Sequence, residues 1–451
     1  MERFEVPATG YDAWAANLDY SQFRKEVHTL GQTLARGQGE EDLKHLRKMV
    51  LWSNMCGAVG MATMWMAHPM GRLLSIIGLS TWTCTRWTMI GHHISHGGYN
   101  TVDDAKVEYE WGHGTGRVHA AGFAVGSVYR RVRDWFDWML PEAWNVEHNN
   151  LHHYRLSESG DPDLVERNLE LLRTIPLPRA VKYIGVAFLA AMWKWYYYAP
   201  NTYKQLKILQ MRKDGIKVSE QDAHEPFTLP VALLDVKEGK KYNTSPIDFM
   251  KRVMGPYLLV RFFLMPAPLL LFSRAFYWTA VANLAFADVL SNIHSFIIIA
   301  TNHCGKDMYK FARSCTPRSG TFFMRAITSS ANFRTSNGIR KDGTARKVHG
   351  FRADVNDFLH GWLNYQIEHH AFPQLSMLSY QKSAPLMRAI CEKHQVPYVQ
   401  ENVFLRLKKT ADIMVGHTDM RVFHESWENP KDFFIWSDQK TAKANDLSDR
   451  L

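Results

Sequence analysis

Long apolar segments constrain this chain more strongly than any other feature of its sequence. They occur as two pairs, and a short turn separates the two segments of each pair. Each segment approaches the roughly 20 residues that an α-helix needs to cross about 30 Å of hydrocarbon. The sequence therefore predicts an all-α integral membrane protein with two transmembrane helical hairpins. The four expected spans are residues 49–67, 71–90, 254–272 and 276–300.

Basic residues flank both predicted hairpins at the ends away from their turns. Lys48 and Arg86 lie at the ends of the first hairpin, and Lys251, Arg252 and Lys306 lie at the ends of the second. Because Lys and Arg near a span favour the cytosolic side, we expect a cytosolic N-terminus and turns on the opposite side. The polar segments then form a cytosolic helical cap that comprises residues 97–179, 201–250 and 304–365.

Three clusters of histidine stand out among the 21 histidines of the chain. They read GHHISH at residues 91–96, HNNLHHY at residues 148–154 and QIEHH at residues 366–370. A single cluster could be incidental. The recurrence of three favours a shared metal site over scattered surface or core histidines.

The spacing inside the clusters has a geometric meaning if these stretches are helical. Residues i and i+4 lie on one face of an α-helix, so His92 with His96, and His148 with His152, would form two-pronged clamps. The remaining histidines could each reach a second ion beside the first, as a site for two metals would require; they are His153, His369 and His370.

The donor type indicates which metal would bind. Neutral imidazole suits iron, copper, nickel and zinc, whereas magnesium and calcium prefer oxygen ligands. Seven candidate histidines exceed the needs of one tetrahedral zinc ion. The sequence therefore favours a site for two irons.

Residues 180–200 form a fifth apolar stretch, for which we expect a different role. If all three clusters serve one metal centre, the chain crosses the membrane an even number of times between the second and third clusters. The second hairpin already supplies two crossings. Lys182, Lys194 and the aromatic run at residues 193–198 suit the headgroup zone. We expect an interfacial helix here, with a fifth span as the alternative.

The composition excludes several other classes of protein. Five cysteines without a C-x-x-C pair argue against a disulfide scaffold or a zinc ribbon. The net charge of +10 has no nucleic-acid module to accompany it, so an anionic membrane surface explains it better. The first residues lack the features of a signal or transit peptide, and no cleaved targeting segment is expected.

With these clusters placed, the chain resembles the membrane fatty acid desaturases, an integral-membrane di-iron family. The matching motifs are H-x-x-x-H, H-x-x-x-H-H and Q-x-x-H-H, and Asp161-Pro162-Asp163 after the second box is also similar. LNYQIEHHAFPQL at residues 363–375 resembles the front-end and sphingolipid branch, in which glutamine replaces the first histidine of the third box. The resemblance implies a desaturase domain at residues 48–400. We expect a polar, partly helical lead-in at residues 1–47 before it and a polar cytosolic tail at residues 401–451 after it.

The resemblance also adds site residues. It implies a further ligand at His303, in the segment Thr301-Asn302-His303, and a role for Gln366 as a ligand directly or through water. His93 stands where the family often has an acidic residue, so it would either orient a ligand or be one. His294, inside the fourth span, is expected to make a polar contact between helices, with metal ligation as the alternative. Two further histidines are expected in the cap without a ligand role, His113 and His119.

The implied activity is O2-dependent introduction of a cis double bond into a lipid chain, with no catalytic residue beyond the metal ligands. Hydroxylation by the same centre is the nearest alternative. A bis-histidine haem protein for electron transfer and a non-catalytic lipid receptor are alternatives from other classes. The substrate could be an acyl-CoA, a glycerolipid or a sphingoid base. The expected location is the endoplasmic reticulum membrane of a eukaryote or the cytoplasmic membrane of a bacterium.

The electron balance of this reaction implies a partner. Forming one double bond while reducing O2 to two waters takes four electrons, and the substrate supplies two. The 451 residues contain no H-P-G-G haem motif, no G-x-G-x-x-G fingerprint and no cysteine set for an iron–sulfur cluster. Residues 1–47 are also too few for a haem domain. We expect a separate donor, either cytochrome b5 with its reductase or a ferredoxin.

Overall fold

The computed structural model describes residues 6–102, 118–334 and 350–434, so His113 and the end of the predicted C-terminal tail lie outside the described residues. The chain divides into two compact units, each described here by itself. The cap unit comprises Met1–Asp42, His148–Val186 and Ile298–Leu451. The hairpin unit comprises Leu43–Glu147 and Ala187–Ile297, and so it includes residues 97–147 and 201–250, which were predicted to belong to the cap.

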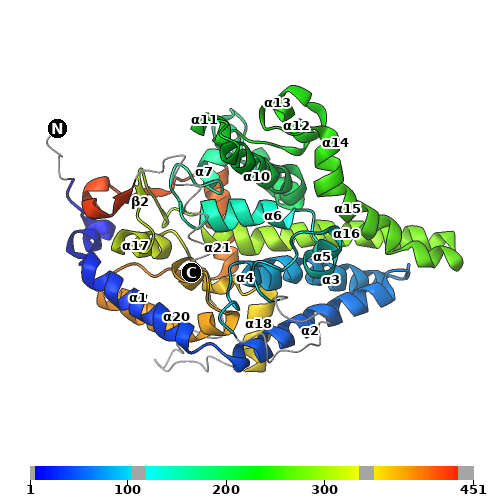
Figure 1. Cartoon of the computed structure of the whole chain (residues 1–451), viewed down its shortest axis with the longest axis horizontal. Helices are drawn as coiled ribbons and strands as arrows, with labels where there is room; N and C mark the ends of the chain where they lie inside the picture. The colour runs from blue at the N-terminus through cyan, green and yellow to red at the C-terminus, as the bar shows by residue number, and fades with distance from the viewer. Residues whose placement is uncertain (1–5, 103–117, 335–349, 435–451) are drawn as a thin grey trace. The chain divides into compact units, whose positions relative to one another are not determined.

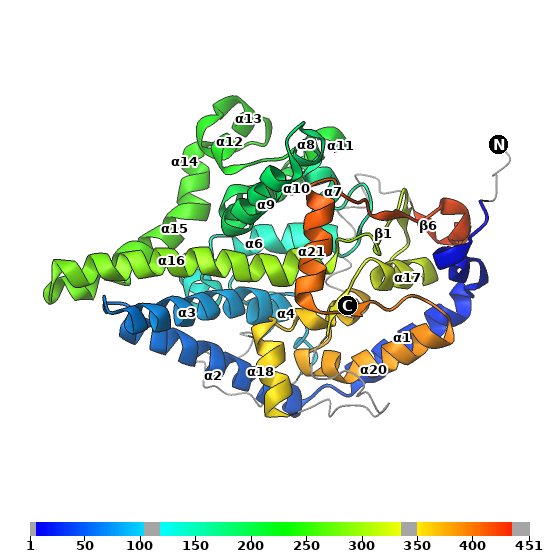
Figure 2. The same cartoon turned by 180° about the vertical axis from the view of Figure 1, so that it is seen from behind.

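The first helical hairpin of the hairpin unit is built from α2 (Glu40–Thr63) and α3 (Pro69–Thr85). The two helices lie side by side in both views (Figures 1 and 2). They approach closely because small residues face one another: a Cβ added to Gly78 would lie 2.6 Å from the carbonyl oxygen of Cys56. The Ser75 hydroxyl donates to the Gly60 carbonyl at 3.1 Å. Small residues and hydroxyl contacts of this kind are typical of helix pairs in membranes.

The second hairpin pairs the helical segment Pro246–Leu271 with α16 (Arg274–Ile299). The first of these segments alternates α, π and 3₁₀ turns, as expected for a helix that contains Pro256, Pro266 and Pro268. Its parts are α14 (Pro246–Phe249), a π-helix (Met250–Met254), α15 (Gly255–Leu258), a second π-helix (Leu259–Leu264) and a 3₁₀-helix (Ala267–Leu271).

Among the described residues, two helical segments are long and apolar enough to cross a membrane, Pro246–Leu271 and Arg274–Asn302. They correspond to the second predicted hairpin. The helices of the first predicted hairpin do not meet this criterion, so the predicted count of four spans is not confirmed. Both α2 and α3 nevertheless expose large apolar side chains, including Leu51, Met55 and Ile77.

The predicted interfacial stretch is helical and longer than expected. It comprises α9 (Arg179–Trp193), a π-helix (Lys194–Tyr198) and α10 (Ala199–Lys213). Ile184 and Phe188 on α9 are 70% and 65% exposed, which suits an apolar environment rather than water. The remaining helices of the hairpin unit are α4 (His92–Ser95), α5 (Val128–Arg130), α6 (Pro141–Trp144), α11 (Glu220–His224), α12 (Leu229–Leu234) and α13 (Val236–Lys241), with π-helices at Arg86–Gly91 and Arg131–Trp135.

The cap unit is mostly helical. Its longest helices, α1 (Tyr20–Arg36) and α20 (Met377–Lys393), lie side by side in both views (Figures 1 and 2). The predicted polar lead-in is therefore largely helical, and the Asp19 side chain caps α1 by accepting from the backbone N–H of Ser21 and of Gln22. The other helices are α7 (Val165–Asn168), α8 (Glu170–Thr174), α17 (Gly320–Thr328), α18 (Phe351–Leu359), α19 (Gln366–Ala371) and α21 (Val403–Met414), with 3₁₀-helices at Gly10–Asn17, Ala300–Asn302, Leu363–Tyr365, Glu425–Trp427 and Pro430–Asp432.

Three two-stranded sheets join distant parts of the cap unit. The parallel pairs are β1 (Tyr309–Lys310) with β5 (Arg421–Val422) and β3 (Asn332–Phe333) with β4 (Gln400–Glu401); the antiparallel pair is β2 (Ser314–Cys315) with β6 (Phe433–Phe434). The buried guanidinium of Arg325 on α17 adds an ion pair to Glu158 at 2.7 Å and another to Glu428. These contacts fasten the C-terminal segment to the loop that follows the second histidine cluster.

Candidate metal centre

The second histidine cluster lies on a π-helix (Asn145–His152), not on the α-helix that its spacing suggested. In a π-helix each N–H bonds five residues back. The N–H of His153 accordingly donates to the carbonyl of His148 at 3.2 Å, and the Nε2 atoms of these two histidines are 3.3 Å apart. The π-helix thus adds a close pair of His148 with His153. His148 and His152 also lie together as predicted, with rings 5.2 Å apart and ligand atoms within 4.8 Å of each other and of Asp163.

Histidines of the second and third clusters form two sets inside the cap unit. Three histidines, His148, His153 and His369, each offer one ligand atom, and these three atoms lie within 4.8 Å of one another. The side chains of all three are at most 5% exposed. We call these three residues the first ligand set.

The second ligand set consists of His152, His303 and His370, whose ligand atoms also lie within 4.8 Å of one another. The Nε2 atoms of His303 and His370 are 3.1 Å apart. His303 follows the 3₁₀-helix Ala300–Asn302 at the end of the fourth predicted span. The structure thus brings together five motif histidines and the sixth, His303, that the family resemblance implied.

Gln366 lies beside the second ligand set. Its side-chain Nε2 is 2.9 Å from the Nε2 of His303. Its Oε1 is buried and has no hydrogen-bond partner among the described residues. A turn of the amide by 180° would direct the oxygen toward His303. An amide oxygen in this place suits a metal ion or a metal-bound water.

Hydrogen bonds to Nδ1 orient three of the ligand imidazoles. The Nδ1 atom of His152 is 2.8 Å from the carboxylate of Asp161, that of His303 is 3.1 Å from the Ser329 carbonyl, and that of His369 is 3.2 Å from the Tyr380 hydroxyl. Since the Tyr380 hydroxyl donates to the carbonyls of Phe372 and Pro373, it accepts from His369. Each of these contacts places the proton on Nδ1 and leaves Nε2 as the metal-binding atom.

Burial favours the neutral form that a metal requires. It lowers the pKa of His303 to about 3, and the neighbouring His152 adds to this effect. Burial also lowers the pKa of His370 well below its usual value, aided by the adjacent histidines. For His152, burial is opposed by the Asp161 carboxylate, and the net effect raises its pKa. A more basic imidazole is a stronger metal ligand.

A buried carboxylate, Glu368, fixes the backbone of the third cluster. Glu368, between Ile367 and His369, accepts from the Asn332 amide and the Tyr398 hydroxyl at 2.8 Å each, and burial raises its pKa to about 7. The Asn332 oxygen in turn accepts from the backbone N–H of Ile367 at 2.9 Å. This network fixes the backbone of α19 from which His369 and His370 project.

A second buried carboxylate, Asp357 on α18, holds the segment before α19. It accepts from the Asn364 amide, the Tyr365 hydroxyl and the Gln381 amide at distances of 2.7–2.8 Å. Burial raises its pKa to about 6. The 3₁₀-helix Leu363–Tyr365 is thereby tied to both α18 and α20.

The first cluster belongs to the hairpin unit. His92 lies on α4, and His96 directly follows this helix. Their ligand atoms lie within 4.8 Å of each other, and the ring centroids are 5.1 Å apart. The predicted pairing of positions i and i+4 on one helix face is therefore confirmed. The Nδ1 of His92 faces the Thr88 carbonyl at 3.2 Å, which directs Nε2 away from the helix.

Other histidines have partners that fit roles outside the ligand sets. His93 is fully buried with its Nδ1 against the Met89 carbonyl. His294 lies against the Cys84 thiol of α3, which agrees with the predicted polar contact between helices. The Nδ1 of His119 accepts from the backbone N–H of Ala121 at 3.2 Å.

Sequence reasoning missed most of the residues that orient the ligands. Asp161 belongs to the motif Asp161-Pro162-Asp163, but the motif does not indicate its role. Tyr380, Ser329 and Asn332 lie 11 to 36 residues from their partners in the sequence and carry no motif of their own, and Glu368 lies inside the third cluster without a sign of its role. The one signal that could have indicated these residues is the presence of a polar side chain within a stretch of otherwise apolar residues.

The donor chemistry fits a transition metal. Two sets of three imidazoles, all buried except the half-buried His303, with an amide oxygen beside one set, match the ligands that iron accepts in proteins and exceed what one tetrahedral zinc needs. Ring nitrogens of different ligands approach one another closely, at 3.1 Å between the Nε2 atoms of His303 and His370 and at 3.3 Å between those of His148 and His153. A metal ion explains such a gathering better than hydrogen bonding between imidazoles does.

Replacing Tyr380 by phenylalanine should weaken iron binding, because His369 then loses the acceptor that fixes its orientation. Loss of such an outer hydrogen bond typically lowers metal affinity about 10- to 100-fold. Iron content per chain, measured on purified protein against increasing chelator, checks this. Y183F is the matched control, since the Tyr183 hydroxyl donates to Asp412 at 2.6 Å away from the ligand sets. Equal iron retention in both variants would contradict the orienting role.

Comparison with known proteins agrees with these observations. A family model described as fatty acid desaturase matches residues 110–402. A fatty acid desaturase 2-like protein of Mus musculus is 42% identical over 59 residues, which are 13% of this chain and 12% of the relative. Fatty acid desaturase 3 of Bos taurus is 48% identical over 42 residues, 9% of this chain and 10% of the relative.

An acyl-lipid (9-3)-desaturase of Borago officinalis is 43% identical over 42 residues, 9% of each chain. The chain thus aligns with about a tenth of the length of these curated relatives, and no solved structure matches it. Since the family model covers more than half of the 451 residues, the chain belongs to the fatty acid desaturase family.

Proposed function

We propose that this protein is an O2-dependent desaturase that introduces a cis double bond into the acyl or sphingoid chain of a lipid. The observation that carries the proposal is the pair of ligand sets in the cap unit, each with three histidines, in a chain of the fatty acid desaturase family. Removing hydrogen from an unactivated methylene is beyond any amino-acid side chain, so an O2-activating metal has to supply that chemistry.

The proposed cofactor is a pair of iron ions held by the two ligand sets. His92 and His96 of the first cluster are proposed as further ligands, and Gln366 as a ligand directly or through water. Bound iron would supply the activation of O2. The protein would hold the imidazoles neutral and oriented, through Asp161, Ser329 and Tyr380.

Front-end regioselectivity is part of the proposal, and it rests on Gln366 and the sequence around it. Methylenes along a lipid chain differ little in chemistry, so selectivity among them has to come from position. The new double bond would then lie between the carboxyl end and an existing double bond, or at the corresponding position of a sphingoid base.

Two alternatives are less well supported. A bis-histidine haem needs two ligands on facing helices, which leaves most of the six clustered histidines unexplained. Hydroxylation of the lipid by the same centre would use the same ligands and differs only in the fate of the substrate after the first hydrogen is removed. The products therefore distinguish hydroxylation from desaturation.

Expression in a yeast-like host, followed by location of new double bonds in each lipid class, tests the proposed activity. The wild-type chain should form a front-end double bond, and H152A or H369A should abolish product and lower bound iron. H417A is the matched control because His417 is a surface residue, 44% exposed. Full activity of H369A would refute the di-iron assignment. Products desaturated only toward the methyl end would refute front-end selectivity.

We also propose four spans with the cap on the cytosolic side. The support is the flanking basic charge together with the exposed apolar side chains of α2 and α3. A tag near Asp214 should report the cytosolic side and a tag near Met70 the opposite side. A non-cytosolic Asp214 would mean that residues 180–200 span the membrane and that the count is wrong.

Electron supply is proposed to come from a separate acidic carrier, either cytochrome b5 with its reductase or a ferredoxin, which docks on the basic cap by charge. Turnover by purified protein should require the added carrier and should fall as salt rises, because exposed charges are screened within about 10 Å at 0.1 M salt. Turnover with a reduced nicotinamide cofactor and O2 alone would contradict the need for a separate carrier.

A further inference from the structure

We propose that a buried network of charged side chains in the hairpin unit positions His92 and His96 of the first cluster. Trp138 and Asp288 are the central positioning residues, and they act through the tryptophans that contact the two histidines. The inference rests on the proposed function in one respect, which is that His92 and His96 bind iron.

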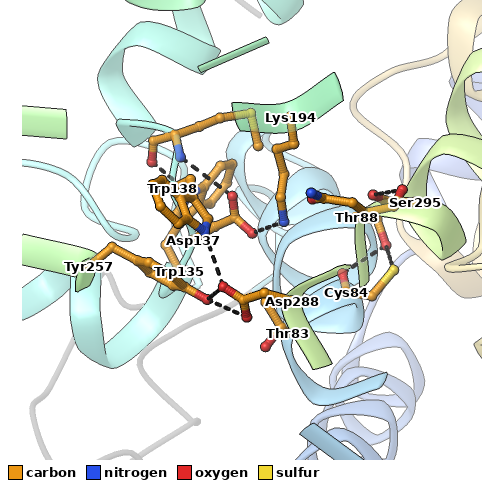
Figure 3. A network of polar contacts seen from close by, with 12 residues as sticks. Thr83, Cys84, Thr88, Trp135, Asp137, Trp138, Lys194, Tyr257, Asp288 and Ser295 are labelled. Atoms are coloured by element: carbon orange, nitrogen blue, oxygen red, sulfur yellow. Dashed lines mark hydrogen bonds and ion pairs between the residues drawn. The ribbon is translucent and has the colours of Figure 1, made fainter. Parts of the chain in front are cut away.

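Asp288 on α16 is the first centre of the network (Figure 3). It is 2% exposed, and its carboxylate accepts from the Tyr257 hydroxyl at 3.0 Å and from the Trp138 indole Nε1 at 3.1 Å. The guanidinium of Arg261, itself fully buried, forms an ion pair with it at 3.1 Å. Asp288 thus ties Trp138 to both helices of the second hairpin.

Asp137, the neighbour of Trp138, is the second centre. Its buried carboxylate binds the ammonium of Lys194 at 2.7 Å (Figure 3). The ammonium of Lys194 also lies 5.3 Å from the centroid of the Trp87 ring. Trp87 belongs to the π-helix Arg86–Gly91, which leads directly to His92. Arg131 completes the network by donating to the carbonyls of Asp137 and Trp138 at 3.0 and 2.8 Å. The segment 131–139 is therefore held at several points by buried charged groups.

This segment contacts the first cluster through two tryptophans. The indole of Trp135 donates to the Met139 carbonyl at 3.1 Å, and its ring lies so close to Gly91 that a Cβ there would be 2.8 Å away. Trp135 also packs on Trp144, with ring centroids 5.3 Å apart. Trp144 contacts the rings of His92 and His96 edge-on, at 5.2 and 6.1 Å. A shift of the segment would therefore move the surface against which both imidazoles rest.

The cost of the network argues for a role beyond stability. Arg261 and Asp288 lie in the two helices that are long and apolar enough to cross a membrane. Ionised groups at such positions are expensive, and apolar residues of similar volume often give equal or greater stability. Directional bonds to Trp138 provide what apolar packing does not, namely one fixed placement of the segment.

Two matched tryptophan variants test the inference on full-length protein in detergent. W138F removes the indole bond to Asp288. W193F removes a comparable indole bond to the same helix, from Trp193 Nε1 to the Asn292 carbonyl at 3.0 Å. Phenylalanine keeps an aromatic ring at the place where Trp193 packs on Trp87, with ring centroids 6.1 Å apart. Iron per chain, the visible spectrum of the iron-loaded protein and the melting temperature are measured for both.

We expect both variants to melt at lower temperature than the wild type, whereas only W138F should lose iron, by at least about twofold, with a changed spectrum of the remaining iron. Should W138F fail to fold, D137N, which keeps the size of the side chain and removes its charge, is judged by the same criteria. Full iron content with an unchanged spectrum in the folded variant, or an equal loss in W193F, overturns the inference. A wild-type protein that binds no iron refutes the proposed function instead.

Discussion

The placement of the proton on three of the six ligand imidazoles is the constraint on which much of the packing of the cap unit depends. A histidine offers Nε2 to a metal when its Nδ1–H finds an acceptor, and in a buried site that acceptor has to come from the protein. His152, His303 and His369 find theirs in Asp161, Ser329 and Tyr380. These partners come from a loop, from the end of α17 and from α20, so the packing of those elements is inseparable from the chemistry of the site.

The same constraint explains why the surroundings of the third cluster are so polar. Glu368 and Asp357 are both buried, and burial raises the pKa of each, yet each accepts hydrogen bonds from two or more side chains. A buried polar network is favourable only if its members are satisfied, and a satisfied network specifies one arrangement. The cost of burying these carboxylates is offset by a rigid backbone beneath His369 and His370.

Much of the site could be predicted from sequence because its signals are local. The pairing of His92 with His96 follows from α-helical periodicity, and the second hairpin follows from apolar length. The pairing of His148 with His153 could not be predicted, since nothing in the spacing distinguishes a π-helix from an α-helix. The orienting residues were missed for another reason: contacts between distant segments leave no periodic signal. The first hairpin shows the limit of apolar length itself, because its helices contain polar residues within the predicted spans, Ser53 and Asn54 in α2 and Arg72 in α3.

The adjacent histidines of the second and third clusters account for the presence of two ligand sets rather than one. Consecutive side chains on a helix point about 100° apart, so two neighbouring histidines cannot easily face the same ion. His152 and His153 diverge in this way, and each contributes to a different set. His369 and His370 do the same from α19. Each H-H pair therefore supplies one ligand to each set, and the sets have to lie side by side. Beyond these shared pairs the sets differ: the π-helix adds His148 to the first, while His303, with Gln366 beside it, completes the second from segments distant in the sequence. The two H-H pairs alone give each set two imidazoles, so each set needs a third, which His148 supplies to the first and His303 to the second.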